Sequence, residues 1–108
     1  MKLRILQLAV VAFYLAGCAA THYHTKQSDR VTFYLRAPGA GGVAFASSLD
    51  AYSPQLASKV DGSRWAVTVA ASSEFRYFYI VDGAVHVPEC RFYEKDDFGS
   101  RNCVYVPE

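Results

Sequence analysis

Acidic and histidine side chains are the residues of this sequence that could perform catalysis or bind a metal. Glu94, Asp96 and Asp97 stand close together, and paired carboxylates can do acid–base work. Their stretch also contains a lysine, which is typical of solvated surface charge. His22 and His24 have no neighbouring cysteine or carboxylate, so they make a weak metal-ligand set. We therefore expect no enzymatic activity, no metal and no cofactor.

Two of the three cysteines predict a disulfide bond. Cys90 and Cys103 enclose about 13 residues, and closing a loop of that length stabilises a fold by about 3 kcal/mol. The N-terminal residues, described next, have the pattern of an export signal. Export implies an oxidising compartment, where an even pair of cysteines normally forms a bridge. The alternative is a pair of free, buried thiols.

The first 17 residues have the pattern of a secretory signal peptide. Lys2 and Arg4 form a short positive head, and residues 5–15 are apolar apart from one glutamine. This run is shorter than the roughly 20 residues that span a bilayer. It ends in Leu-Ala-Gly-Cys at Cys18, which resembles the lipobox of bacterial lipoproteins.

The lipobox resemblance implies that residues 1–17 are removed and that Cys18 carries the lipid. Each buried acyl CH₂ contributes about 0.8 kcal/mol, so several chains anchor a small domain firmly in a membrane. Ala19, where an aspartate would retain the protein in the inner membrane, implies the outer membrane if the organism is Gram-negative. The alternative is an ordinary signal peptide cleaved near Ala20, with Cys18 lost.

Residues 18–29 are polar and aperiodic, and we expect them to be a lipidated tether. Residues 30–107 contain six or seven short alternating runs, rich in Val, Tyr, Phe and Thr, with turns every 8 to 12 residues. These residue types favour strands, and no helical period is present. The pattern predicts an all-β, antiparallel sandwich of immunoglobulin-like size.

The most unusual run is FRYFYIVDG, residues 75–83. A half-buried strand normally has one polar face, but here Phe78 and Ile80 make the second face apolar as well. Segment 49–60, a ligand or a partner could cover that face. Asp82 and Gly83 predict a tight hairpin turn, in which Asp82 stabilises the turn through its own side chain and Gly83 supplies a positive φ.

Four segments occur in an order that resembles the family-48 carbohydrate-binding modules. They are residues 31–45, Trp65, residues 77–83 and residues 96–106. Glycogen-binding domains and the early-set domains of isoamylase-type enzymes are relatives. The resemblance implies an immunoglobulin-like early-set sandwich that binds α-glucan without catalysis. Flat aromatic rings stack on the apolar faces of the sugar, and a few polar groups bind its hydroxyls.

The resemblance assigns a carbohydrate-binding surface to five residues. Phe98, Ser100 and Asn102 match the family pattern, whereas Tyr52 replaces a tryptophan and Phe78 replaces a lysine. Val85 stands where a second tryptophan is expected and cannot stack on sugar. We expect Trp65 to be a core or sheet-edge aromatic and not a sugar platform.

The sequence thus predicts a non-catalytic, lipid-anchored protein of the cell envelope. Its expected ligand is an α-glucan or another glycan. The alternative is a protein-interaction or structural envelope module that uses the same scaffold, because the changes at Phe78 and Val85 make the surface more apolar. The net charge of +1 and the absence of a basic block argue against nucleic acid as a partner.

Overall fold

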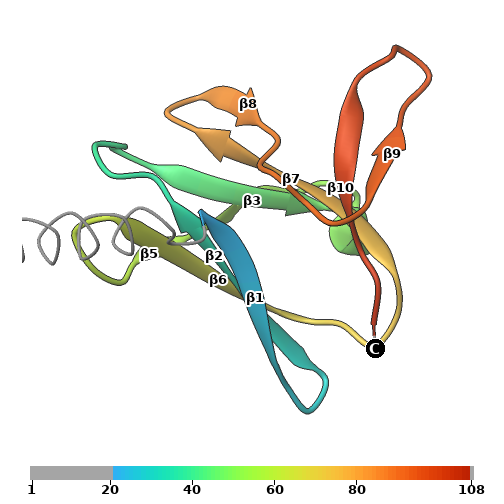
Figure 1. Cartoon of the computed structure of the whole chain (residues 1–108), viewed down its shortest axis with the longest axis horizontal. Helices are drawn as coiled ribbons and strands as arrows, with labels where there is room; N and C mark the ends of the chain where they lie inside the picture. The colour runs from blue at the N-terminus through green and yellow to red at the C-terminus, as the bar shows by residue number, and fades with distance from the viewer. Residues whose placement is uncertain (1–20, 108) are drawn as a thin grey trace, which may run out of the picture.

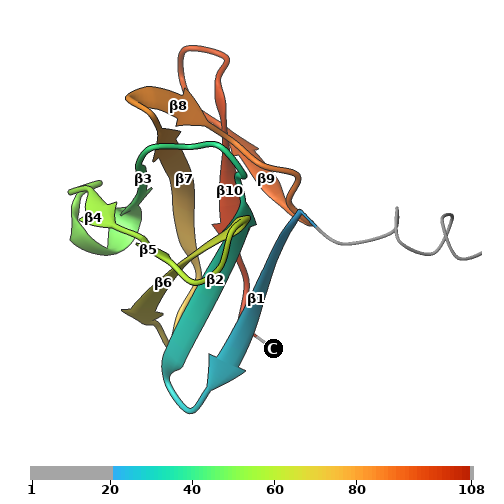
Figure 2. The same cartoon turned by 90° about the vertical axis from the view of Figure 1, so that its left-hand side faces the viewer.

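The computed structural model describes residues 21–107, which form ten strands and one 3-10 turn. Figures 1 and 2 show two sheets that face each other. The strands are β1 (His22–Gln27), β2 (Arg30–Arg36), β3 (Val43–Ser47), β4 (Gln55–Leu56), β5 (Ser58–Lys59), β6 (Arg64–Ala70), β7 (Phe75–Val81), β8 (Ala84–His86), β9 (Tyr93–Lys95) and β10 (Arg101–Tyr105), with the turn η1 (Ser48–Asp50) after β3. Within residues 21–107, no helix is long and apolar enough to cross a bilayer.

The strand order is that of an immunoglobulin-like sandwich. One sheet has the order β1-β2-β6-β5, and the other has the order β4-β3-β7-β10-β9, with β8 added to the end of β7. These orders correspond to the A-B-E-D sheet and the C-F-G sheet of the immunoglobulin fold. All pairings are antiparallel. The predicted all-β antiparallel sandwich is therefore confirmed.

Aromatic rings fill the space between the sheets. Phe33 of β2 is fully buried and contacts Phe45, Tyr77 and Tyr105 with ring centroids 4.8 to 5.9 Å apart. Each buried ring removes about 150 to 250 Å² from water, at about 25 cal/mol per Å². Trp65 is 9% exposed and donates its indole N–H to the carbonyl of Ala37, which confirms its prediction as a core or sheet-edge aromatic.

The sandwich begins earlier than predicted. His22–Gln27 were expected to belong to an aperiodic tether, but they pair with β2 along their whole length as β1. The first two inward positions of this strand are His22 and His24, which pack on core rings such as Phe33. The predicted tether was wrong for these residues because the ring of histidine can replace an apolar side chain at a sheet edge.

The predicted disulfide between Cys90 and Cys103 is confirmed, with a Cα–Cα distance of 5.7 Å. Cys103 is fully buried on the inner face of β10. Cys90 lies in the connection between β8 and β9. The bridge therefore attaches a loop with little secondary structure of its own to the edge of the core.

Candidate functional site

The outward side of β7 forms the centre of the first candidate site. Phe75, Tyr77 and Tyr79 are buried, while the alternate residues are only half-buried, as the period-two pattern predicted. The outer face of the six-stranded sheet is thus built around Phe78 and Ile80. We call this surface the outer face.

A row of apolar side chains crosses the outer face. In the register of the sheet, Ile80 of β7 lies between Ala44 of β3 and Val85 of β8, and Ala44 pairs with Leu56 of β4. Leu56 is 87% exposed and Val85 is 68% exposed. Four neighbouring strands therefore present one continuous apolar row to solvent.

Tyr52 covers Phe78, which lies next along β7. The two rings are stacked, with centroids 5.7 Å apart and an interplanar angle of 16°. Tyr52 remains 36% exposed, so its own ring is accessible. Segment 49–60 therefore covers part of the outer face with the Tyr52 ring, and it leaves Leu56 in solvent.

The backbone that carries Tyr52 is strained. Ala51 and Tyr52 both have left-handed conformations, with φ of 58° and 64°. Such a conformation costs about 1 to 3 kcal/mol at a residue other than glycine. The N–H of Tyr52 donates to the carbonyl of Ser47 at 2.7 Å, and this bond together with the ring stack offsets the strain. The position of the Tyr52 ring is thus determined by the fold.

Asn102 lies on the outer face near Phe78. Cys103 pairs with Tyr77, so Asn102 is level with Phe78 where β10 begins to separate from β7. Cys103 and Tyr105 point into the core, and alternation therefore directs Asn102 outward. The structure brings together Tyr52, Phe78 and Asn102 on one face, next to the apolar row.

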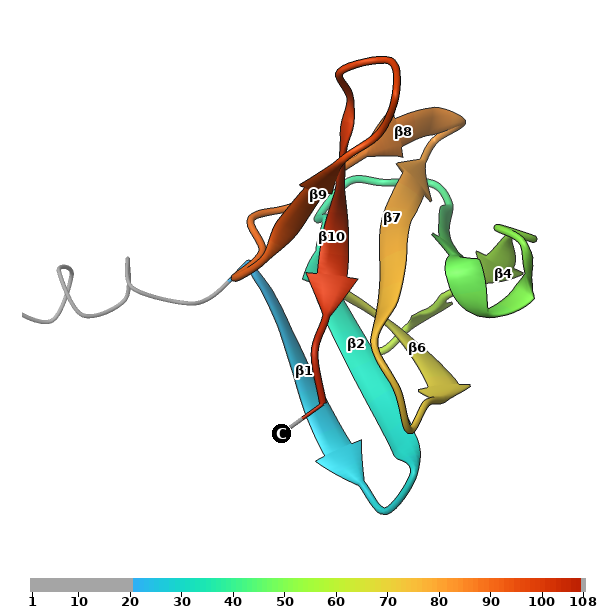
Figure 3. The ribbon, with the colours of Figure 1, turned by 90° about the vertical axis from the view of Figure 1, so that its right-hand side faces the viewer.

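Phe98 and Ser100 lie apart from that group, at the tip of the β9–β10 hairpin that extends from the sheet (Figures 1 and 3). The Asp96 carboxylate accepts from the backbone N–H groups of Phe98 and Ser100 at 2.9 and 3.0 Å. Gly99 supplies a φ of 85°. Phe98 is 94% exposed, so an ordered turn presents an aromatic ring directly to solvent.

The charged groups near the outer face bind one another. Arg76 Nε donates to Glu94 Oε2 at 2.7 Å, and Glu74 lies 3.5 Å from the same guanidinium. The hydrogen bond and charge of Glu94 raise the pKa of Arg76. Glu94 therefore forms an ion pair with Arg76, and the Asp96 carboxylate accepts hydrogen bonds within its own turn.

Asp82 has a different role from the one predicted. Its carboxylate accepts from the N–H groups of Gly41 and Gly42 at 2.8 and 3.0 Å, and thus binds a distant loop instead of its own turn. A Cβ at Gly41 would lie 3.3 Å from this carboxylate. The turn itself is as expected, since Asp82 and Gly83 have φ of 50° and 83°.

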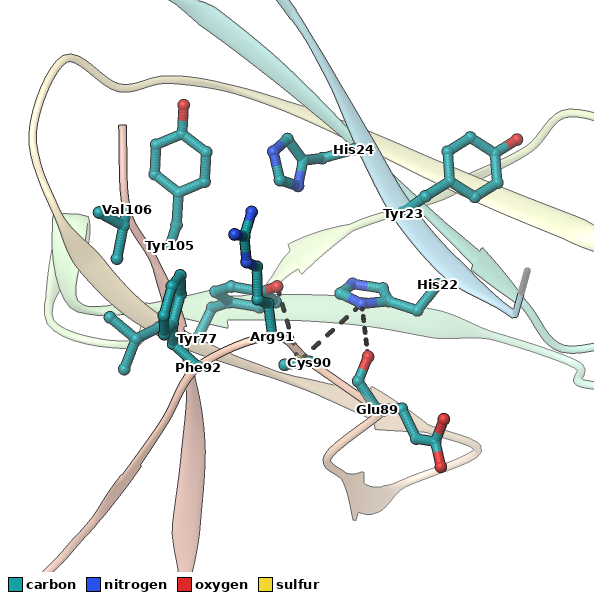
Figure 4. A pocket seen from close by; sticks show the side chains of 11 residues that line it. His22, Tyr23, His24, Tyr77, Glu89, Cys90, Arg91, Phe92, Tyr105 and Val106 are labelled. Atoms are coloured by element: carbon teal, nitrogen blue, oxygen red, sulfur yellow. Dashed lines mark hydrogen bonds between the residues drawn. The ribbon is translucent and has the colours of Figure 1, made fainter. Parts of the chain in front are cut away.

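A second candidate site lies between β1 and the end of β10, and the sequence analysis missed it. Figure 4 shows this pocket, which has a volume of about 280 Å³. Its lining residues are His22, Tyr23, His24, Tyr77, Glu89, Cys90, Arg91, Phe92, Val104, Tyr105 and Val106. The alternation of His22 and His24 with Tyr23 and Thr25 is the sequence feature that could have indicated it. We call this cavity the edge pocket.

His22 is one of two strongly perturbed groups in the edge pocket, together with Tyr77. Its Nε2 lies 3.0 Å from the Tyr79 hydroxyl and its Nδ1 lies 3.3 Å from the Glu89 carbonyl. Burial lowers the pKa of His22 from 6.5 to about 4, and burial raises the pKa of Tyr77. His22 is thus a neutral imidazole near pH 7, with both ring nitrogens in contact with protein oxygens.

Among residues 21–107, no three His, Cys, Asp or Glu side chains come together as a metal-binding group. The two ring nitrogens of His22 already have protein partners. His24 instead places its ring against Tyr105, with centroids 5.2 Å apart. The two histidines therefore act as aromatic packing groups at the edge of the sandwich.

The sequence matches no protein-family model, and no curated protein matches it. The class of protein that the fold and sites define is a disulfide-bonded, immunoglobulin-like β-sandwich with an aromatic outer face. Cys18, the predicted lipidation site, lies outside the described residues.

The lowered pKa of His22 predicts that the fold loses stability as the pH falls from 6.5 to about 4. In this range the unfolded chain takes up a proton that native His22 does not. The free energy of unfolding should fall by about 2 kcal/mol between pH 7 and pH 5 because of His22. Urea titrations at both pH values measure this change.

His22→Gln should remove this part of the pH dependence. The matched control is His86→Gln, because His86 is exposed on β8. It should retain most of the dependence, since burial is the largest cause of the lowered His22 pKa and the charge of His86 is a smaller one. Equal pH dependence in wild type and His22→Gln would contradict the role of buried His22.

Proposed function

We propose that this chain is a non-catalytic, lipid-anchored binding protein of the bacterial cell envelope and that its outer face binds a glycan. The observation that carries the proposal is the grouping of Tyr52, Phe78 and Asn102 on one face. These are positions at which the resemblance to family-48 modules places sugar contacts. The class of ligand that fits is an α-glucan or a related polysaccharide.

The binding mode follows from the chemistry of the exposed side chains. A pyranose has apolar C–H faces, which stack on the exposed ring of Tyr52 or on Phe98 at the hairpin tip. Asn102 and Ser100 supply an amide and a hydroxyl for the sugar edge. Phe78 offers no hydrogen bond, so few polar contacts hold the sugar. We expect weak binding that depends on several adjacent sugar units.

Affinity electrophoresis in native gels that contain glycogen or amylopectin tests this proposal. Wild-type protein should migrate more slowly as the polysaccharide concentration rises. Tyr52→Ala and Phe98→Ala should each weaken binding about tenfold, because each removes one stacking ring. Tyr34→Ala is the control, since Tyr34 lies on the outside of the other sheet, where it stacks on Tyr23. Unchanged migration at high polysaccharide concentration would contradict glycan binding.

A protein partner is the second candidate, and the apolar row favours it. Leu56 and Val85 expose aliphatic surface that sugar hydroxyls cannot use. A contiguous apolar patch on a folded domain commonly marks a protein interface.

Protein binding predicts a discrete crosslinked product from a photo-reactive residue at position 85 in living cells. Val85→Asp, made in a chain with the probe at position 56, should abolish that product, because a charge would enter the interface. A probe at position 68, on the outside of the four-stranded sheet, is the control. Equal crosslinking from positions 85 and 68 would contradict a specific interface on the outer face.

Lipid attachment at Cys18 is tested separately. Cells that express wild-type protein and are fed an alkyne analogue of palmitate should give a labelled protein in the membrane pellet. Cys18→Ser should lose the label and leave the pellet, because the thiol is the acceptor. The matched control is Cys90→Ala/Cys103→Ala, which should keep the label. Labelling that survives Cys18→Ser would refute the anchor.

A further inference from the structure

Within residues 21–107, one long edge of β1 has no partner strand. Among the described strands β1 pairs with β2 alone, and the Arg36 N–H donates to the carbonyl of Thr21 at 2.8 Å. In an antiparallel ladder the backbone N–H and C=O groups of alternate residues point toward the partner strand, and this bond identifies Thr21 as one of those residues. The N–H and C=O groups of His22, His24 and Lys26 therefore point away from β2. No backbone hydrogen bond satisfies these groups within residues 21–107.

The edge pocket lies beside this free edge. The Val104 N–H donates to the carbonyl of Phe92, just before β9. Beyond this bond the two segments separate, so β9 does not cover Tyr105 and Val106. β1 and β10 both contribute residues to the lining of the pocket, and Figure 3 shows the two strands near each other. Contact between the rings of His24 and Tyr105 brings the two sheets together there. A row of backbone donors and acceptors therefore runs along the rim of the pocket.

The edge pocket can accommodate one large side chain. Its volume is about 280 Å³, and its walls include Tyr77, Phe92 and Val106. The imidazole of His22 is neutral near pH 7, so it does not favour a negatively charged side chain in the pocket. In Figure 4, rings from both sheets surround the cavity. Glu89 and Arg91 also line the pocket, and an aromatic or long aliphatic side chain fits the part of the lining that the rings form.

We propose that β1 and the edge pocket bind an extended peptide segment of a protein partner by strand addition. The backbone of the peptide would pair with His22, His24 and Lys26, and one of its apolar side chains would fill the pocket. In this mode main-chain hydrogen bonds provide affinity and the pocket provides specificity. The site is separate from the outer face and does not depend on the proposed glycan.

Charge specifies a second feature of the peptide. Lys26 occupies the inner side of β1 beyond the pocket and is exposed. In the part of the chain that the structure describes, no carboxylate forms an ion pair with it. An acidic residue two positions from the pocket-filling residue would face Lys26, because alternate residues share one side of a strand.

A second copy of this chain fits the edge less well than such a peptide. Antiparallel pairing of two β1 strands about His24 would place Lys26 opposite His22 and His24 opposite its own copy. The residues that enter each pocket would then be His or Lys, and not the aromatic or long aliphatic side chain that the lining accommodates. The composition of β1 therefore favours a different partner sequence.

A phage-displayed library of random heptapeptides, selected on the intact sandwich, tests the proposal. Enriched peptides should contain an aromatic or long aliphatic residue and an acidic residue two positions apart. A synthetic copy of an enriched peptide should slow hydrogen exchange of the His22, His24 and Lys26 amides at least tenfold, measured by NMR. A library that yields no binder, or a binder whose protection maps to the outer face, would overturn the proposal.

His24→Pro and His24→Ala form the matched pair of variants. Both remove the imidazole, but only proline removes the outward N–H, and proline is tolerated where an edge N–H faces solvent. The selected peptide should bind His24→Pro at least tenfold more weakly than His24→Ala. Equal binding would overturn strand addition.

Urea titration must first show that the two variants have similar stability. If they differ, Lys26→Pro and Lys26→Ala replace them, because Lys26 contacts the core less. If the wild-type protein forms dimers and His24→Pro dissociates them, the occupant of the edge is a second copy of this chain. That result would overturn the proposal of a peptide from a different protein.

Discussion

The contact between Phe33 of β2 and Tyr77 of β7 is the interaction on which both candidate sites depend. Their ring centroids lie 4.8 Å apart, and each residue comes from the central region of its sheet. Because strand residues alternate in direction, fixing Tyr77 inward fixes Phe78 outward, where it supports Tyr52. Tyr77 also lines the edge pocket and contacts His22 at 5.8 Å. One buried ring thus determines where the outer face and the edge pocket lie.

The sequence pattern was sufficient for those parts of the fold that follow from local rules. Alternation in residues 75–81 separated the buried from the outward side of β7, and Asp82-Gly83 located the hairpin. The spacing and expected compartment of Cys90 and Cys103 predicted their bridge. The alternation and the hairpin depend on residues close in sequence, and the bridge depends on disulfide formation between two cysteines. None of these features requires knowledge of the whole topology.

Features that depend on distant contacts could not be predicted in this way. β1 carries polar residue types, and the core rings beneath it explain why His22 and His24 can form a strand. His22 packs on Phe33, Tyr77 and Tyr79, and His24 packs on Phe33 and Tyr105. Asp82 accepts hydrogen bonds from a loop about 40 residues earlier in the chain, instead of from its own turn. The strained conformation of Tyr52 is offset by Phe78 and Ser47, which local propensity does not include. In each case tertiary contact overrode the local preference.

The early start of β1 also changes how the proposed anchor would place the two sites. If Cys18 carries the lipid, only three residues separate it from His22, and four extended residue steps reach about 14 Å at most. The predicted tether of residues 18–29 would have allowed about three times that distance. The start of β1 and the edge pocket would therefore lie close to the membrane surface, whereas the outer face belongs to the sheet that does not contain β1. With a lipid at Cys18, the proposed occupants of the edge pocket would therefore be membrane-proximal segments, whereas the outer face would remain on the opposite sheet of the sandwich.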